Sequence, residues 1–149
     1  MTTETIKKYK SKSLNNLKVI AQKHFNLFIR LRDTDENGTG VCISSGKYLK
    51  VPSENTHAGH FYSAGGYPNL RFNEDNCHLQ GKSDNYFKSG NLLEYRKNLI
   101  KKIGIQKVEV LDMKAADYKR NGYKWDRFFL IETIEKYKIK SQELQKTKI

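Results

Sequence analysis

Cysteine and proline are scarce in this sequence, and long apolar runs are missing from it. The 149 residues include two cysteines and two prolines. Cys42 and Cys77 are too few for a disulfide scaffold, and one chain cannot complete a four-cysteine zinc site. No apolar run approaches the roughly 18 residues of a membrane span, and no signal peptide is recognisable. We therefore expect a cytoplasmic protein of one ordinary domain, with no membrane partner.

Acidic residues are also in the minority. The chain has 28 lysines and arginines against 16 aspartates and glutamates, which gives a net charge of +12. The excess is spread along the chain and is not held in one tail. A basic globular protein of this kind usually binds a polyanion, and the charge favours nucleic acid. The alternative is that the chain comes from a proteome that is generally rich in lysine.

The pattern of apolar residues predicts an α+β protein with a small β centre wrapped by helices. Residues 1–12 are polar and rich in lysine, so we expect them to be flexible. Ser13 is a good N-cap for a helix that runs to about Arg30. The other predicted elements are strands over 41–43, 48–51, 56–62 and 76–80, a helix over 92–103 that ends at Gly104, a short helix over 105–112 and a last helix over 124–145.

Polar residues in the central stretch suit the hydrolysis of a phosphodiester. That reaction needs a base for water and a cation for the charge that develops on phosphate. His60 leaves a predicted strand and suits the first task, whereas Asn85 at a helix start supplies an oxygen for a hard cation such as Mg²⁺. Asn76 is placed to hold the loop that carries the histidine. His78 has the same strand parity as Asn76, so both are expected to point toward one site.

Each of these residues also has a structural interpretation. His60 alone fits a hydrogen-bonded strand histidine, and Asn85 fits a helix terminus. His57 is out of step with His60 and is expected to face elsewhere. Cys77 fits a small core residue. The spacing by itself does not decide between the two interpretations.

An ordered series of motifs resembles the lambdoid phage NinG family, also called Rap. The family's members are recombination nucleases with an HNH-type, or ββα-metal, core. Ala58-Gly59-His60-Phe61 is one of the motifs that carry the resemblance. The others lie at residues 28–38, 42–47, 70–80, 89–91, 94–96 and 99–104. The resemblance implies a metal-dependent, structure-specific endonuclease for branched DNA, such as Holliday junctions or displaced-strand intermediates. It would act in the host cytoplasm if the chain is phage-encoded.

The resemblance also implies an arrangement and a set of roles. A small ββα-metal core would lie between N- and C-terminal helices, with a nuclease domain over 13–112 and a helical extension over 113–149. His60 would be the general base and Asn76 the middle asparagine of the HNH signature. Asn85 would bind Mg²⁺ or Mn²⁺, with His78 as a second ligand or a phosphate contact.

Two departures from the family pattern concern metals. The family carries a C-x-x-C pair on each of two zinc knuckles, and of those four positions only Cys42 is a cysteine here. We therefore expect no structural zinc, and we expect packing and hydrogen bonds to hold the knuckles. In addition, many HNH enzymes place aspartate directly before the base histidine, where this chain has Gly59. The divalent metal would then need another ligand, for which His78, Asp84 and Asp75 are the candidates.

Basic residues around the site are the expected phosphate contacts. Tyr62 and Tyr67 are expected to stack on an unpaired base. A homodimer is one arrangement for cutting paired strands, and the last helix would either form its interface or pack on its own core. A DNA-binding protein without cleavage, or a basic virion or host-interaction protein, are the alternative functions. The predicted phosphate contacts are Arg30, Arg32, Arg71, Lys82, Lys88, Arg96, Lys97 and Lys101.

Overall fold

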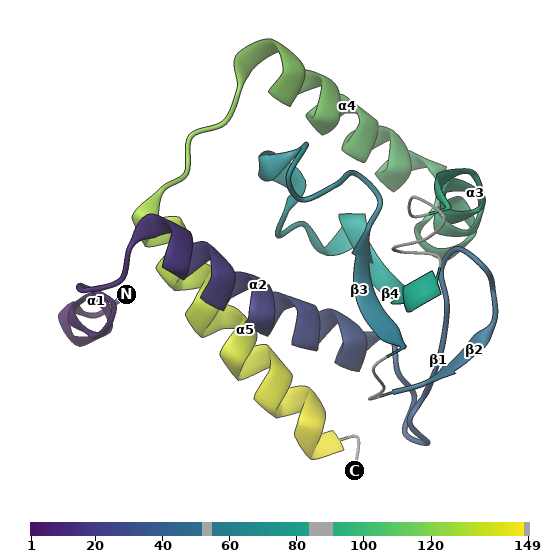
Figure 1. Ribbon diagram of the computed structural model, residues 1–149, viewed down its shortest axis with the longest axis horizontal. Helices are drawn as coiled ribbons and strands as arrows, with labels where there is room; N and C mark the ends of the chain where they lie inside the picture. The colour runs from purple at the N-terminus through teal and green to yellow at the C-terminus, as the bar shows by residue number, and fades with distance from the viewer. Residues whose placement is uncertain (52–54, 84–90, 148–149) are drawn as a thin grey trace.

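The computed structural model describes residues 1–51, 55–83 and 91–147. It is an α+β structure in which helices outweigh two small sheets (Figure 1). The helices are α1 (Thr3–Lys8), α2 (Leu14–Arg32), α3 (Leu92–Ile103), α4 (Ile105–Asn121) and α5 (Arg127–Thr147). The strands are β1 (Thr39–Val41), β2 (Tyr48–Lys50), β3 (Thr56–His60) and β4 (Cys77–Gly81). None of the described helices is long and apolar enough to cross a membrane.

Two antiparallel pairs make up the sheets. β1 pairs with β2, and β3 pairs with β4 in a register that sets His60 opposite Cys77 and Gly59 opposite His78. Because directly opposed residues share a face, His60 and Cys77 lie on one face of the β3–β4 pair and His78 lies on the other. His57 pairs with Gln80 and lies on the face away from His60, as its parity predicted.

Helices cover both faces of the β3–β4 pair. Ala58 and Cys77 pack against Phe25 and Phe28 of α2 on one face. On the other face the buried Tyr95 of α3 donates a hydrogen bond from its hydroxyl to the carbonyl of Gly59 at 2.6 Å. Two separate cores therefore hold the pair from opposite sides. Behind Tyr95, the second core joins α3 to α4 through Leu99, Val108, Leu111 and Ala115.

The last helix packs on the first long one. The early part of α2 meets the early part of α5 through Leu17 and Leu130, and the later parts meet through Phe25 and Tyr137. The two helices therefore run in the same direction, side by side in Figure 1. The last helix was expected either to form a dimer interface or to pack on the chain's own core. Its buried face packs on the core.

Residues 1–12, expected to be flexible, have a defined place. Thr2 caps α1, and Tyr9 is buried against the α2–α5 core. The Arg127 guanidinium donates to the carbonyls of Tyr9 and Lys12 at 2.5 and 2.7 Å. Arg127 lies more than a hundred positions away in the sequence. The composition of residues 1–12 therefore could not predict that this contact holds them in place. Ser13 caps α2 as predicted, since its hydroxyl accepts the N–H of Asn16.

The short helix predicted over 105–112 is longer than expected. α4 continues to Asn121, so the expected boundary between residues 112 and 113 falls inside one helix. Buried Val108, Leu111 and Ala115 extend its apolar stripe past that boundary, and Gly122 ends it with a positive φ of 72°.

Candidate functional site

His60 lies at the end of β3 on the face covered by α2. Its Nε2 is 2.8 Å from the carbonyl oxygen of Arg71, in the loop between the strands. Its ring stacks near Phe25, with 6.3 Å between the ring centroids. The histidine is therefore fixed at both its polar edge and its apolar face, which is the positioning that a catalytic base requires.

The hydrogen bond to Arg71 decides the tautomer of His60. A carbonyl oxygen only accepts, so Nε2 carries the proton and Nδ1 keeps its lone pair in the neutral ring. Within the described chain the polar neighbour of Nδ1 is the Cys77 sulfur at 3.9 Å. Burial raises the pKa of Cys77, so the sulfur is a protonated thiol and a weak donor. Burial also lowers the pKa of His60, which keeps the ring neutral at neutral pH.

Asn76 holds the loop that carries His60. It is fully buried at the end of a short 3₁₀ turn (Glu74–Asn76), directly before β4. Its Oδ1 accepts the N–H of Tyr62 at 2.9 Å. Its Nδ2 donates to the carbonyls of Tyr62 and Leu70 at 2.9 and 3.1 Å. The side chain thus ties the two ends of the inter-strand loop together, as its position in the sequence predicted.

His78 does not join His60. It lies on the opposite face of the strand pair, and its Nε2 donates to the carbonyl of Asp75 at 2.8 Å. Its Nδ1 accepts from Arg32 and Lys102 at 3.0 and 2.9 Å. Burial and these two cations lower the pKa of His78 to about 3. His78 was expected to be a second metal ligand, but both of its ring nitrogens form hydrogen bonds within the protein. The expectation that His78 and Asn76 point toward one site was wrong because Asn76 does not lie on the strand.

Arg32 is structural and not exposed for phosphate. Its Nε and Nη2 form a two-pronged contact with the Asp33 carboxylate at 2.8 and 2.9 Å, and Nη2 also donates to the carbonyl of Cys77. Asp33 in turn accepts the N–H of Leu79 and pairs with Lys102 at 3.0 Å. This group, which we call the edge cluster (Arg32, Asp33, His78 and Lys102), satisfies the outer edge of β4. The roles of Asp33 and Lys102 were not predicted, because no local spacing in the sequence links these residues.

Three other predicted phosphate contacts are arginines with defined surroundings. Arg71 donates from Nε to Gln22 at 2.7 Å. Arg96 forms a two-pronged pair with Asp112 at 2.8 and 3.0 Å and stays partly exposed. Arg30 is half-buried, and burial lowers its pKa.

The predicted lysines are more open. Lys82, Lys97 and Lys101 are exposed, although Lys97 pairs with Glu94 at 3.3 Å. Two predicted residues, Asn85 and Lys88, lie outside the described part of the chain.

Aromatic residues gather on the loop after His60. Tyr62 contacts Phe61 and Tyr67 edge to face, at 5.0 and 4.8 Å between ring centroids. The Tyr62 hydroxyl donates to Asp112 at 2.5 Å, and burial together with this bond raises the pKa of Tyr62 to about 12. The Lys119 ammonium lies over the Tyr67 ring at 4.7 Å. The two tyrosines predicted to stack on a base thus lie side by side, half-buried, next to a cation.

The first knuckle keeps its turn through hydrogen bonds. The Cys42 carbonyl accepts the N–H of Gly46, and its sulfur accepts the N–H of Gly81 at 3.2 Å. Ser44 lies 3.4 Å from the same sulfur and accepts from the Gln80 amide at 3.0 Å. The expected support by hydrogen bonds is therefore present at Cys42. The described residues bring no group of three or more His, Cys, Asp or Glu side chains together in a way that could hold a metal ion.

Gly59 occupies a place that admits no side chain. A Cβ there would meet the side chain of Gln80, whose own Cβ would be 2.9 Å away. We expect Gly59→Ala to lower the free energy of unfolding by about 1–2 kcal/mol, because one of the two side chains must leave its packed position. Urea denaturation measures the change. Gly65→Ala is the control, since a Cβ at Gly65 meets nothing within 4 Å. Equal stability of the two variants would contradict the prediction.

Comparisons with known proteins identify relatives over nearly the whole chain. The family model described as Bacteriophage Lambda NinG protein matches residues 2–147. Protein ninG of Salmonella phage P22 is 40% identical over 120 residues, which is 80% of this chain and 54% of the relative. Protein ninG of Escherichia phage lambda is 39% identical over 129 residues, which is 86% of this chain and 54% of the relative. The chain thus spans about half the length of these relatives. No solved structure matches it. This chain belongs to the NinG family of bacteriophage proteins.

Proposed function

We propose that this chain is a metal-dependent, structure-specific endonuclease that cuts branched DNA, such as Holliday junctions or displaced-strand intermediates, in phage recombination. The observation that carries the proposal is that His60 is held in one orientation and that Asn76 fixes the loop next to it. One nitrogen of His60 is bound to a loop carbonyl, and the other keeps a lone pair at neutral pH. Asn76 is buried and fixes the loop that orients His60. A histidine that only fills space in the core would not need this support.

In the proposed reaction, His60 Nδ1 takes a proton from a water molecule as the water oxygen attacks phosphorus. The bond from phosphorus to one bridging oxygen breaks, and that oxygen gains a proton from solvent. General base catalysis of this kind contributes about 10²–10⁴-fold to a rate. The neutral ring is the active form, and its lowered pKa keeps it neutral in the physiological range.

Charge supports DNA as the substrate. The net charge is +12, and the exposed Lys82, Lys97 and Lys101 are available to phosphates. Arg96 keeps an exposed side even though Asp112 holds it. Arg32 is withdrawn from this set because the edge cluster uses its guanidinium.

The HNH-type core and its divalent cation, Mg²⁺ or Mn²⁺, remain part of the proposal. Asn85, the ligand that the family resemblance implies, lies outside the described residues. The described residues bring no three His, Cys, Asp or Glu side chains together that could hold the cation. Absence of a structural zinc likewise stays a prediction, and metal analysis of the purified protein would test it. A homodimer also stays a prediction.

The test is incubation of the purified chain with a labelled four-way junction, with and without Mg²⁺ or Mn²⁺. We expect cation-dependent cleavage, and we expect binding to weaken steeply between 50 and 200 mM salt, on the order of tenfold or more, because several phosphates are neutralised. A linear duplex of the same sequence is the control and should remain uncut. An intact junction under all conditions would overturn the nuclease assignment.

A DNA-binding protein without cleavage is the second candidate. The observation that favours it is the absence of a three-ligand cluster among the described residues, together with Gly59 at a common ligand position. It predicts a retarded junction in a binding gel and no cleavage in any lane. The same experiment therefore separates the two candidates.

A further inference from the structure

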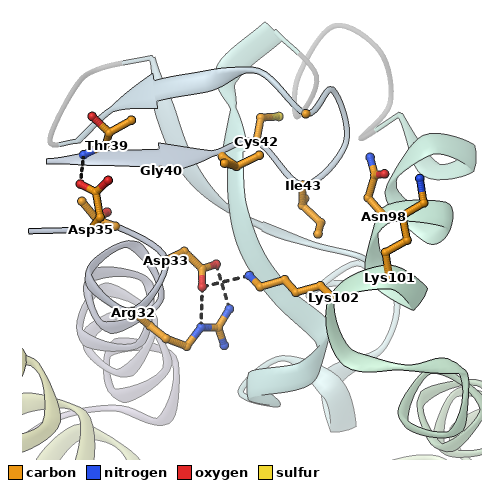
Figure 2. A pocket seen from close by; sticks show the side chains of 13 residues that line it. Arg32, Asp33, Asp35, Thr39, Gly40, Cys42, Ile43, Asn98, Lys101 and Lys102 are labelled. Carbon is orange, nitrogen blue, oxygen red and sulfur yellow. Dashed lines mark hydrogen bonds and ion pairs between the residues drawn. The ribbon is translucent and has the colours of Figure 1, made fainter. Parts of the chain in front are cut away.

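The structure contains a cavity of about 690 Å³ that His60 does not line. It lies between the C-terminal end of α2, the β1 strand with the turn that follows it, and α3 (Figure 2). Gly40, Val41 and Ile43 give it an apolar wall, and Val41 is half exposed. Its volume is in the range of small-molecule sites, which is about 300–1,000 Å³. Nothing in the proposed nuclease reaction uses this cavity.

The cavity adjoins an excess of positive charge. In the edge cluster two cations, Arg32 and Lys102, share the single carboxylate of Asp33, and Figure 2 shows Asp33 between them. His78 does not add a charge, because burial and the two cations lower its pKa to about 3. The cluster thus holds one more positive charge than negative charge. Asp33 is 6% exposed and Lys102 39%, so part of this excess faces the cavity.

The other acidic residue in the cavity wall does not cancel that excess. One carboxylate oxygen of Asp35 accepts the N–H groups of Asn37 and Thr39, both at 2.9 Å. The exposed Lys101 also lines the cavity, so the lining has three cations against the two carboxylates of Asp33 and Asp35, which is a net charge of +1. Lys101 forms no ion pair or hydrogen bond with the residues that the structure describes. Its ammonium is therefore available to a ligand.

Polar groups complete the wall opposite β1. Asn98 of α3 lines the cavity one turn before Lys101 and Lys102, and its amide makes one long contact, 3.4 Å to the Ser44 carbonyl. Figure 2 draws Asn98 and Lys101 on the same side of the cavity, facing the β1 wall. An amide can bond the edge of a flat heterocycle, and a lysine binds phosphate as a point charge.

We propose that this cavity holds one unpaired nucleotide of DNA. The base lies against Val41 and Ile43 with its edge toward Asn98. Its phosphate contacts the ammonium groups of Lys101 and Lys102, where the lining has one positive charge in excess. A fully paired duplex delivers a base into such a cavity only at the cost of unpairing and unstacking it, about a few kcal/mol, whereas a branch point or a displaced strand offers bases that are already unpaired. The DNA source rests on the proposed function. The nucleotide chemistry itself rests on the cavity, its apolar wall and its uncompensated charge.

The first experiment uses the intact chain and small probes. Thymidine 5′-monophosphate, thymidine and inorganic phosphate are each titrated while the methyl resonances of Val41 and Ile43 are followed by NMR. We expect the monophosphate to shift both methyls in a saturable way and to bind at least tenfold more tightly than thymidine or phosphate alone. Lys101→Ala should weaken the monophosphate by about tenfold, the effect of losing one charge-assisted contact.

The matched control is Lys107→Ala on α4. Lys107 is exposed, does not line the cavity and is not one of the predicted phosphate contacts. The Lys107→Ala protein should bind the monophosphate as the unsubstituted chain does. Three results would overturn the proposal: no methyl shift at millimolar monophosphate, equal binding by Lys101→Ala, or inorganic phosphate binding as tightly as the nucleotide, which would leave an anion site only.

The second experiment carries the proposal to DNA. A junction with 2-aminopurine at an unpaired position is titrated with His60→Gln protein, which is used so that DNA stays uncut. We expect the fluorescence to change when the junction binds. The double variant Asn98→Ala and Lys101→Ala should remove most of that change, whereas Lys107→Ala should keep it. If the unsubstituted chain does not cleave the junction, the proposed function is wrong, but the fluorescence result still holds. If the double variant gives the same fluorescence response as the unsubstituted residues do, the proposed nucleotide site is wrong, whether or not the chain cleaves DNA.

Discussion

Replacing His60 with glutamine is expected to slow junction cleavage by about 10²–10⁴-fold, the range that a positioned general base contributes. The glutamine amide can still donate to the carbonyl of Arg71 and fill most of the space beside Phe25. It has no basic lone pair to replace Nδ1. The loss should therefore appear in the single-turnover cleavage rate and leave the affinity for the junction unchanged.

His57→Gln is the matched control for this variant. Both variants replace a histidine of β3 with glutamine, but His57 lies on the opposite face of the strand pair from His60. Its cleavage rate should stay within a fewfold of the unsubstituted chain. The rate of the unsubstituted chain should also rise with pH through a pKa below the usual histidine value of about 6.5 and then level off, because burial lowers the pKa of His60. Cleavage by His60→Gln at the unsubstituted rate would exclude His60 as the base.

Asp33→Asn should lower the free energy of unfolding at neutral pH by about 3 kcal/mol. Removing one partner of a buried ion pair costs about 3–5 kcal/mol, because the charge left behind is uncompensated. Here two cations, Arg32 and Lys102, lose the carboxylate that both of them pair with in the described part of the chain. The lower end of the range applies because Lys102 is 39% exposed and can turn toward solvent. Urea denaturation of both proteins at pH 7 measures the difference.

The pH dependence gives this prediction a second readout. Burial raises the pKa of Asp33, but the hydrogen bonds from Arg32, the charge of Lys102 and the N–H of Leu79 outweigh it, so the pKa lies well below its usual range. A lowered folded-state pKa stabilises the protein above the unfolded value of about 3.9, and this part is lost as the pH falls below it. The stability difference between the two proteins should therefore shrink below about pH 4.

An exposed ion pair supplies the control for Asp33. Glu94→Gln removes the carboxylate that pairs with Lys97, and both side chains are at least half exposed. Pairs of this kind contribute about 0.2–1 kcal/mol, so the change in stability should be small. A comparable loss in Asp33→Asn and Glu94→Gln would show that the edge cluster is no more than a surface contact.

Local signals predicted the parts of the fold that depend on neighbouring residues. The cap at Ser13, the apolar stripe of α2 and the glycine after α3 each place an element boundary within a few residues. The strand pair that carries His60 was also predicted, as was the role of Asn76 in holding the loop. These features follow from spacing and from side-chain chemistry that acts over a few positions.

Long-range contacts explain what the sequence did not reveal. Arg127 fixes the N-terminal residues, and Arg32 reaches β4, through bonds between positions 45 to 118 apart. Periodicity carries no information on such pairs. The misplacement of His78 has a related cause: strand parity was counted from Asn76, which lies in a 3₁₀ turn and not on the strand. The residue types were recognised, whereas their surroundings were not.

The side-by-side packing of α2 and α5 also constrains how the protein is made. α2 is synthesised early, but Leu130, Ile131, Ile134 and Tyr137, which cover its apolar stripe, follow roughly a hundred residues later. Contacts this far apart in sequence slow folding, and apolar surface that waits for its partner is prone to aggregate. During translation, the sides of Phe25 and Phe28 that meet Tyr137 therefore stay uncovered until α5 has left the ribosome, although β3 and β4 can already pack on α2. We expect the nascent chain to expose this apolar surface to chaperones throughout that interval.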